Sequence, residues 1–461
     1  MRVVVVGYGM AGARLSAELV ARGRDVKVTA FGAETHPAYN RILLSSVLAG
    51  RAREEDLTLA APPSGVDVRL GVAVTGIDAA RRVVGTPDGE EEYDALVLAT
   101  GSRAVVPPVP GLSGAAVFRT LDDCRRIVAG AGRARTALVL GGGLLGLEAA
   151  RGLAGRGLDV TVVHAAGHLM ERQLDADAAA VLSATLWGLG VRVLVDAQAV
   201  ERVEGGLRLA DGRVVTADLL VVACGVRPET ALAERAGLAV GHGVVVDDGL
   251  LTSAPDVYAI GDCVEHRGTV YGLVAPAWEQ AAALADRLTG GDSRYTGSRV
   301  VTRLKAGGID LAAMGSLEPA GAEVLSFADP ARGTYAKLVV RQDRLAGAVL
   351  LGDNPAVGTV VQLFDRAAPV PADRRTLLLG RSLGGGPAAV AESPALMPDR
   401  ALVCRCNSVT KAAVTACWRG GTRDVAGVAA ATRATTGCGS CRDAVAGILD
   451  WLSTVDPGSV R

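Results

Sequence analysis

Short apolar runs alternate with amphipathic stretches along the first 300 residues of the chain. Residues 2–6 form a β-branched run that predicts a buried strand, and a helical pattern at 14–21 and a second strand at 26–31 follow. The same order of strand, helix and strand recurs at 137–140, 147–154 and 160–163. Further apolar runs that predict strands lie at 95–99, 219–223 and 257–260. Strand–helix alternation of this kind predicts parallel sheets of the doubly wound type.

From about residue 300 the pattern changes. Antiparallel strands are predicted at 324–327, 335–340 and 345–350, with Asp343 and Arg344 at a hairpin turn. Residues 369–398 are rich in proline and glycine and predict a linker. A compact cysteine-bearing segment follows, and the last six residues are expected to fray.

Each of the two strand–helix units carries a Gly-x-Gly-x-x-Gly turn between its first strand and its helix. The glycines are Gly7, Gly9 and Gly12 in the first turn and Gly141, Gly143 and Gly146 in the second. In such a turn the first glycine permits the tight bend, the second lets the backbone approach a pyrophosphate, and the third allows close helix–strand packing. Because both turns follow an apolar strand and open a helix, the sequence predicts two dinucleotide-binding domains.

The residue about 20 positions after each glycine turn distinguishes the two nucleotide sites. An acid near this place holds a ribose hydroxyl. Glu34 is the candidate after the first turn, whereas the strand after the second turn ends in His164, where an NAD-selective site usually has Asp or Glu. Without that carboxylate a 2′-phosphate is not repelled, so the choice between NADH and NADPH stays open.

Four of the eight cysteines form a cluster near the end of the chain. They read Cys-x-Cys and then Cys-x-x-Cys and are Cys404, Cys406, Cys438 and Cys441. Spacing alone fits either a zinc ion or a 2Fe–2S cluster, since both accept four thiolates. The remaining cysteines are scattered and are expected to be buried small residues; they are Cys124, Cys224, Cys263 and Cys417.

Composition excludes several classes of protein. Apolar residues make up 49%, too many for a disordered chain, and 48 Lys and Arg balance 49 Asp and Glu. A formal net charge of −1 gives no general attraction to nucleic acid or to an anionic membrane. No apolar run is long enough to predict a membrane-spanning helix, and the N-terminus does not read as a signal peptide, so we expect a cytoplasmic protein.

Several further fragments, taken in chain order, resemble the two-dinucleotide-binding-domain flavoproteins. Thr100 and Gly101 end one strand, Gly261 and Asp262 end another, and the turn that begins at Gly225 resembles the one beside the nicotinamide. The resemblance implies that FAD occupies the first glycine turn and NAD(P)H the second, and that Asp262 binds the flavin ribityl chain. It also implies that residues 278–281 begin the helix that faces the flavin pyrimidine.

The segment 38–46 resembles the flavin-contacting stretch of ferredoxin reductases and nitrite reductases. Ferredoxin reductases commonly carry Lys where this chain has Ser46, and no Cys-x4-Cys follows the first unit as it does in disulfide reductases, so the nitrite-reductase branch matches better. Together the motifs and the resemblance assign FAD to Gly7, Gly9, Met10, Ala11, Gly12, Glu34, Arg41, Ser45, Val74, Thr100, Gly101, Gly261 and Asp262. They assign NAD(P)H to Gly141, Gly143, Leu144, Leu145, Gly146, Glu148, His164 and Gly225.

The sequence around the four cysteines resembles the bacterioferritin-associated-ferredoxin-like domain, which binds a 2Fe–2S cluster. Residues 402–410 and 432–441 carry the resemblance. It implies that Cys404, Cys406, Cys438 and Cys441 are cluster ligands, and that a cluster rather than zinc stands beside the flavin domain.

Residues 1–452 as a whole resemble the electron-transfer part of the assimilatory nitrite and nitrate reductase family. The resemblance implies two Rossmann-like domains, the second inserted in the first, then a small α+β domain and a small helical 2Fe–2S domain. The expected bounds are 1–115 and 245–298 for the first α/β domain, 116–244 for the second α/β domain, 299–368 for the third domain, 369–398 for a linker, 399–452 for the C-terminal domain and 453–461 for a tail.

The implied function is an FAD-dependent NAD(P)H dehydrogenase that passes electrons through a 2Fe–2S cluster. No catalytic acid or base is expected, because the cofactors carry the chemistry. We expect the sirohaem half of a complete nitrite reductase to be absent, and therefore expect a separate catalytic subunit: first a nitrate reductase, second a nitrite-reducing subunit. Two alternatives stay open, namely an opine- or amino-acid-oxidising flavoprotein subunit and a redox-sensing or cluster-delivering binding protein.

Overall fold

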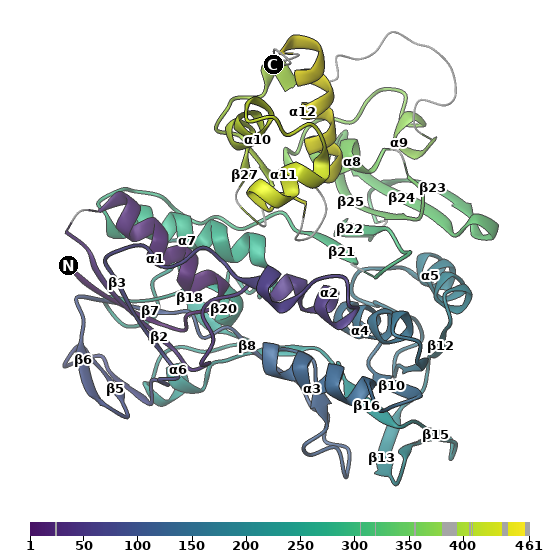
Figure 1. Ribbon diagram of the computed structural model, residues 1–461, viewed down its shortest axis with the longest axis horizontal. Coiled ribbons are helices and arrows are strands. Elements are labelled where there is room, and N and C mark those ends of the chain that lie inside the picture. The colour runs from purple at the N-terminus through teal and green to yellow at the C-terminus, as the bar shows by residue number, and fades with distance from the viewer. Residues whose placement is uncertain are drawn as a thin grey trace.

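The structure is a computed structural model in which two α/β units lie beside each other, with an antiparallel sheet and a helical unit above them (Figure 1). It describes residues 1–23, 25–304, 306–318, 320–354, 356–379, 394–404, 407, 409–435 and 441–456.

A five-stranded parallel sheet forms the centre of the first α/β domain. Its spatial order is β19 (Val257–Ala259), β7 (Ala95–Leu98), β1 (Arg2–Val6), β2 (Lys27–Gly32) and β3 (Val66–Leu70). Helices α1 (Met10–Arg22) and α7 (Val274–Leu288) pack together over this sheet (Figure 1). Because the sheet is covered, β1 and β7 read as continuous apolar runs rather than alternating ones. Smaller elements are α2 (Leu44–Leu48), β4 (Gly76–Asp78), β5 (Val83–Thr86), β6 (Gly89–Glu92), α6 (Ala231–Arg235), β18 (Val244–Val246) and β20 (Val264–His266).

The second α/β domain repeats this plan. Its parallel sheet has the order β12 (Val191–Leu194), β11 (Asp159–Val163), β10 (Thr136–Leu140), β16 (Leu219–Val222) and β9 (Ala116–Val117). Its helices are α3 (Leu121–Ala131), α4 (Leu144–Gly155) and α5 (Ala176–Gly188), and a small antiparallel sheet adds β13 (Ala199–Val203), β14 (Gly206–Leu209) and β15 (Val214–Thr216). The chain enters and leaves through an antiparallel ribbon of β8 (Ser102–Ala104) and β17 (Val226–Pro228). Two doubly wound sheets therefore confirm the predicted fold class.

An antiparallel sheet forms the third domain. Its order is β21 (Val301–Leu304), β22 (Leu311–Gly315), β25 (Arg344–Leu351), β24 (Thr334–Arg341) and β23 (Glu323–Asp329), and helix α8 (Val357–Asp365) packs on β25. The predicted hairpin between β24 and β25 turns at Gln342 and Asp343, which both have positive φ angles of 48° and 55°.

The first part of the expected linker is packed rather than extended away from the protein. Val370 and Leu377 are buried in the core of the third domain, and the Val370 N–H donates to the Asp343 carbonyl at 2.7 Å. A short helix, α9 (Thr376–Leu379), follows. Pro369 and Pro371 predict a linker, but the apolar residues Val370 and Leu377 are buried against the third domain. Residues 380–393 lie outside the described residues.

Three helices and a two-stranded ribbon make up the C-terminal domain. They are β26 (Leu402–Cys404), β27 (Val409–Thr410), α10 (Lys411–Arg419), α11 (Val425–Thr432) and α12 (Arg442–Val455). Helix α12 extends through residue 455, so the first three residues of the expected tail are helical.

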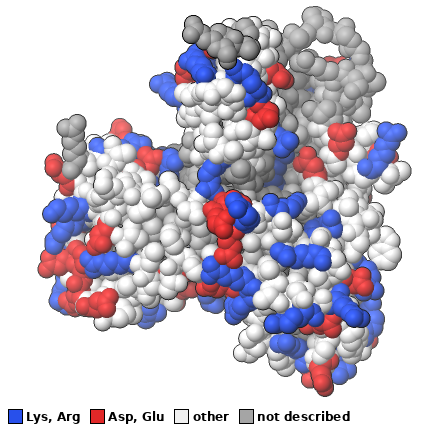
Figure 2. All heavy atoms as spheres, viewed as in Figure 1, with Lys and Arg blue, Asp and Glu red and all other residues white. Residues whose placement is uncertain are grey.

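Surface character agrees with the near-neutral composition. On the face that Figure 2 shows, basic and acidic side chains are interspersed, and no broad field of one sign appears among the coloured residues. Within the described ranges, no helix is both long and apolar enough to cross a membrane.

Candidate functional site

The two glycine turns have the same geometry, and packing explains two of the three glycines in each. Gly7 has φ +107°, and a Cβ there would lie 2.2 Å from the Ala99 carbonyl oxygen. A Cβ on Gly12 would lie 2.0 Å from the Gly7 carbonyl oxygen. In the second turn, a Cβ on Gly141 would lie 2.3 Å from the Ala223 carbonyl oxygen, and a Cβ on Gly146 would lie 2.0 Å from the Gly141 carbonyl oxygen. The first and third glycines of each turn are therefore required by contacts within the protein, because a side chain there would overlap with backbone atoms.

The second glycine of each turn is different. A Cβ on Gly9 or on Gly143 would meet nothing within 4 Å among the described atoms. Both are N-cap residues, of α1 and α4, and in the described structure no side chain caps either helix. Uncapped backbone N–H groups at a positive helix end bind phosphate groups, so each turn leaves space where a pyrophosphate fits.

Asp262 lies at the centre of a polar network beside the first turn. Its carboxylate accepts hydrogen bonds from Ser102 Oγ at 3.1 Å and from an Arg119 guanidinium nitrogen at 2.8 Å. The Arg119 guanidinium also donates to the carbonyl and the hydroxyl of Ser102. The Asp262 and Arg119 side chains are each 20% exposed, so the carboxylate is held in a fixed place yet stays reachable for a ligand hydroxyl.

Helix α7 ties the flavin-side turns together. The Trp278 indole N–H donates to the Met10 carbonyl at 3.2 Å, and the buried Gln280 side chain accepts the Gly261 N–H at 2.7 Å. The expectation that residues 278–281 begin this helix is wrong, because it begins at Val274. Pro276 is compatible with the first helical turn, where a missing N–H costs nothing.

An ion pair joins Glu34 to the segment expected to contact flavin, residues 38–46. Glu34 forms an ion pair with Arg41 and accepts the Tyr39 hydroxyl at 2.8 Å, and Arg41 also stacks over the Tyr39 ring. Burial raises the pKa of Tyr39, which keeps this hydroxyl protonated as a donor. The Ser45 hydroxyl is buried and has no hydrogen-bond partner within the described part of the chain. An orphaned buried hydroxyl here fits a segment that a bound cofactor completes.

The remaining residues assigned to FAD lie after strands, at the start of α1 or in a loop. The Thr100 hydroxyl donates to the Glu229 carbonyl at 2.7 Å, and Gly101 and Gly261 have φ angles of +74° and +84°. Val74 is half-buried against the core of the first α/β domain. Met10 and Ala11 begin α1.

His164 directly follows β11, and its imidazole is turned onto the second glycine turn. Nδ1 accepts the Gly142 N–H at 3.1 Å, while Nε2 lies 3.1 Å from a Glu171 carboxylate oxygen. The residue is 8% exposed. Leu144, Leu145 and the buried Glu148 lie on α4, and Gly225, with φ +93°, precedes β17.

Two of the four clustered cysteines belong to the described residues, and both lie in one core. Cys404 and Cys441 are buried together with Trp418 and Val445. The Thr435 N–H points at Cys441 Sγ at 3.2 Å, the kind of contact that stabilises a metal-bound thiolate. Two buried sulfurs with a backbone donor fit an iron–sulfur site. Cys406 and Cys438 lie outside the described residues, as do the flanking Gly437 and Gly439.

Two of the four scattered cysteines, Cys124 and Cys263, are buried, as expected. The other two, Cys224 and Cys417, are half-buried. Burial raises the pKa of the Cys124 and Cys224 thiols to about 11, so neither is a reactive thiolate at neutral pH.

Sequence reasoning did not single out Arg119 or Gln280 as individual site residues. Neither belongs to a recognisable motif, since Arg119 precedes the Thr120–Asp123 capping box of α3 and is distant in sequence from Asp262. The one available signal was a basic residue directly before a helix start, which is common. Asp122 and Asp123 both lie in the first turn of α3.

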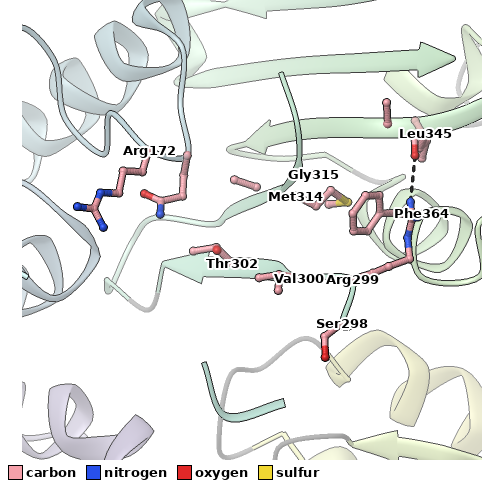
Figure 3. A pocket seen from close by; sticks show the side chains of 12 residues that line it. Arg172, Ser298, Arg299, Val300, Thr302, Met314, Gly315, Leu345 and Phe364 are labelled. Carbon is pink, nitrogen blue, oxygen red and sulfur yellow. Dashed lines mark hydrogen bonds between the residues drawn. The ribbon is translucent and has the colours of Figure 1, made fainter. Parts of the chain in front are cut away.

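A separate cavity of about 520 Å³ lies between the second α/β domain and the third domain. Arg172 reaches it from one side, while Arg299, which donates to the Leu345 carbonyl at 3.2 Å, lies against Phe364 on the other (Figure 3). None of the residues assigned to FAD or NAD(P)H lines it.

Comparison with known proteins matches each region. Residues 1–281 match the pyridine nucleotide-disulphide oxidoreductase family, residues 301–364 the rubredoxin NAD+ reductase C-terminal domain, and residues 402–451 the BFD-like [2Fe-2S] binding domain. A solved putidaredoxin reductase–putidaredoxin complex is similar with a TM-score of 0.74 and 28% identity, over 80% of this chain and 94% of that one.

Two curated relatives come from Bacillus subtilis (strain 168). The chain is 38% identical to a nitrite reductase [NAD(P)H] over 97% of its own length and 57% of that protein's. It is 36% identical to an assimilatory nitrate reductase electron transfer subunit, over 98% of its own length and 60% of the relative's. It therefore spans somewhat more than half the length of these relatives. With its two glycine turns and its first 281 residues matched, the chain belongs to the pyridine nucleotide-disulphide oxidoreductase family.

Proposed function

We propose that this chain is an electron-transfer subunit that oxidises NAD(P)H and passes the electrons to a separate catalytic subunit. FAD would occupy the first glycine turn, NAD(P)H the second, and a 2Fe–2S cluster the C-terminal domain. The observation that carries the proposal is the pair of open, uncapped glycine turns in one chain with two buried cysteines. When bound, these groups supply hydride transfer from nicotinamide to flavin and then single-electron steps to the cluster, two electrons per nicotinamide.

The chain's own residues bind and orient. Backbone N–H groups at the start of α1 and α4 would hold the pyrophosphates, with Gly9 and Gly143 giving the room. Asp262, fixed by Arg119 and Ser102, would accept a ribityl hydroxyl. Glu34, held by Arg41 and Tyr39, would face the ribose of the FAD adenosine. No side chain is assigned to move a proton in the hydride step.

For the partner, a nitrate reductase is proposed first and a nitrite-reducing subunit second. The similarity to an assimilatory nitrate reductase electron transfer subunit, over 98% of this chain, supports the first. The similarity to nitrite reductase supports the second.

An amine- or opine-oxidising subunit is the rival function. Its flavin would be reduced by the amine substrate, and a second dinucleotide turn would have no use. The second turn has the same geometry as the first, and a Cβ on Gly143 would meet no described atom within 4 Å. This space for a pyrophosphate favours NAD(P)H binding.

Anaerobic titration of the purified holoprotein separates the two functions. NADH, NADPH and an opine such as octopine are added in turn while the flavin absorbance near 450 nm is followed. We expect rapid bleaching by at least one nicotinamide and none by the opine; the reverse pattern would overturn the proposal. Nitrate and nitrite reduction by the complex with its co-purified partner then identifies the acceptor.

A further inference from the structure

A single arginine of the C-terminal domain reaches across to the first α/β domain. The Arg433 guanidinium donates through Nη1 to the carbonyl oxygen of Thr58 and through Nη2 to the carbonyl oxygen of Asp56. Two donors of one planar group thus bind two carbonyl groups of a distant segment, which fixes orientation as well as distance. Ile42 of the first α/β domain also packs against the core that contains Cys404 and Cys441.

The backbone of Arg433 has a conformation that an arginine rarely adopts. It follows α11 in the left-handed region, with φ 64°, and its N–H closes the helix on the Ala429 carbonyl. Glycine is the usual residue at this position, because a Cβ strains the left-handed conformation. When a residue keeps a strained backbone conformation and its side chain makes specific hydrogen bonds, the side chain is expected to have a role.

On the cluster side, Arg433 is bound into the loops that carry the ligands. Its carbonyl accepts the Asn407 side-chain amide at 2.6 Å, and Asn407 follows Cys406 by one residue. Two residues after Arg433, the Thr435 N–H points at Cys441 Sγ. The position of the arginine is therefore coupled to the position of a ligand sulfur.

On the flavin side, the two carbonyl groups belong to a segment paired with the flavin-contacting stretch. Tyr39 and Thr58 form a β-bridge, and the Asn40 N–H donates to the Leu57 carbonyl at 2.8 Å. Arg41 and Ser45 belong to the same flavin-contacting stretch, residues 38–46. The guanidinium thus joins the backbone next to the expected flavin to the backbone next to the expected cluster.

We propose that Arg433 is the positioning residue that docks the C-terminal domain on the first α/β domain and sets the path for electron transfer between flavin and cluster. This inference rests on the proposed function. Two electrons leave each nicotinamide and cross this contact one at a time, so each turnover uses the docked arrangement twice.

The test uses the full-length holoprotein and two variants that keep the domain folded. Arg433→Gly removes the side chain and also relieves the left-handed strain, so we expect it to fold at least as well as the wild type. Arg433→Lys keeps the charge but loses the second donor arm. The control is Arg419→Ala, because the Arg419 side chain is 70% exposed in the same domain and forms an ion pair with Asp456 of that domain.

Two measurements are made on each variant. Hydrogen exchange reports the protection of residues 38–59, and stopped-flow absorbance reports flavin reduction and cluster reduction separately. We expect Arg433→Gly to raise exchange in 38–59 and to slow cluster reduction at least tenfold while flavin reduction is unchanged. Arg433→Lys falls between, and Arg419→Ala behaves as wild type.

Unchanged exchange, or unchanged cluster reduction, in Arg433→Gly would overturn the docking role. A fall in both rates together would also overturn it, because it would mean damage beyond the contact. If the wild type itself shows no flavin reduction by either nicotinamide, the proposed function fails instead, and the exchange measurement still decides whether Arg433 docks the domain.

Discussion

At the scale of single residues, the glycines of the two turns divide into those the protein requires and those a ligand requires. Gly146 stands against the Gly141 carbonyl, whereas Gly143 faces open space. The order of the glycines in the motif predicts this division, because the second glycine is the one that approaches a pyrophosphate. The structure adds the backbone atoms that the first and third glycines contact.

Alanine at each position separates these roles. We expect Gly146→Ala to destabilise the protein by about 3 kcal/mol, because a methyl group there meets backbone that must move. We expect Gly143→Ala to leave the unfolding midpoint unchanged and to weaken NAD(P)H binding about tenfold, or roughly 1.4 kcal/mol. Thermal unfolding and nucleotide titration check this. Equal nucleotide affinity in Gly143→Ala and wild type would contradict the assignment of the second turn.

Arg119 gives a second prediction at this scale. Because its guanidinium holds both Asp262 and Ser102, Arg119→Lys cannot make all of these contacts with one ammonium group. We expect the purified variant to carry less than half the wild-type FAD content, measured from the ratio of flavin to protein absorbance. Arg103→Lys, at an exposed position nearby, serves as the control and should keep full FAD content. Full occupancy in Arg119→Lys would remove Arg119 from the site.

At the scale of elements, the sequence predicted β1, β7, β10 and β11 to within about one residue, since buried parallel strands are plain apolar runs. It predicted the start of α7 four residues too late. The helix begins before Pro276, and a proline usually argues against a helix at its position. It also treated Val370 and Leu377 as linker, because their burial depends on a sheet edge formed far away in the sequence. Arg119 and Arg433 were missed for the same reason: each acts on residues that only the fold brings near.

The joint between α5 and β24 gives a prediction with a pH dependence. Asp175 caps α5 at the Ala178 N–H and accepts Lys337 Nζ at 2.7 Å and the Tyr335 hydroxyl at 3.0 Å. Burial raises the pKa of Asp175, but these hydrogen bonds outweigh it and hold the pKa below its ordinary value. A lowered folded-state pKa contributes stability that is present above the unfolded value of about 3.9 and is lost as the pH falls through the folded value.

We therefore expect Lys337→Met to lose about 1 kcal/mol of stability at pH 7. The difference from wild type should shrink below about pH 4, as Asp175 becomes protonated in both proteins. Chemical denaturation at pH 7 and pH 3 measures it, with Lys27→Met, at an exposed strand end, as control. A loss that is the same at both pH values would show that the ion pair is not its cause.

At the scale of the whole molecule, one chain brings together two dinucleotide sites and a cysteine-bearing domain whose docking residue contacts the flavin side. Glycine makes up 59 of the 461 residues, and this count alone predicts no site. The positions of the six glycines in the two turns predict two dinucleotide-binding sites. The sequence could predict the parts because each has a local motif. It could not predict the contact of Arg433 with Asp56 and Thr58, which joins segments at opposite ends of the chain.

The proposed function requires that electrons from NAD(P)H reach the C-terminal cluster within this chain. Rapid freezing of the anaerobic holoprotein after mixing with NAD(P)H, followed by electron paramagnetic resonance, measures this transfer. We predict that the flavin absorbance falls first and that the signal of a reduced 2Fe–2S cluster then rises. A flavin that is fully bleached while the cluster signal never appears would contradict the account.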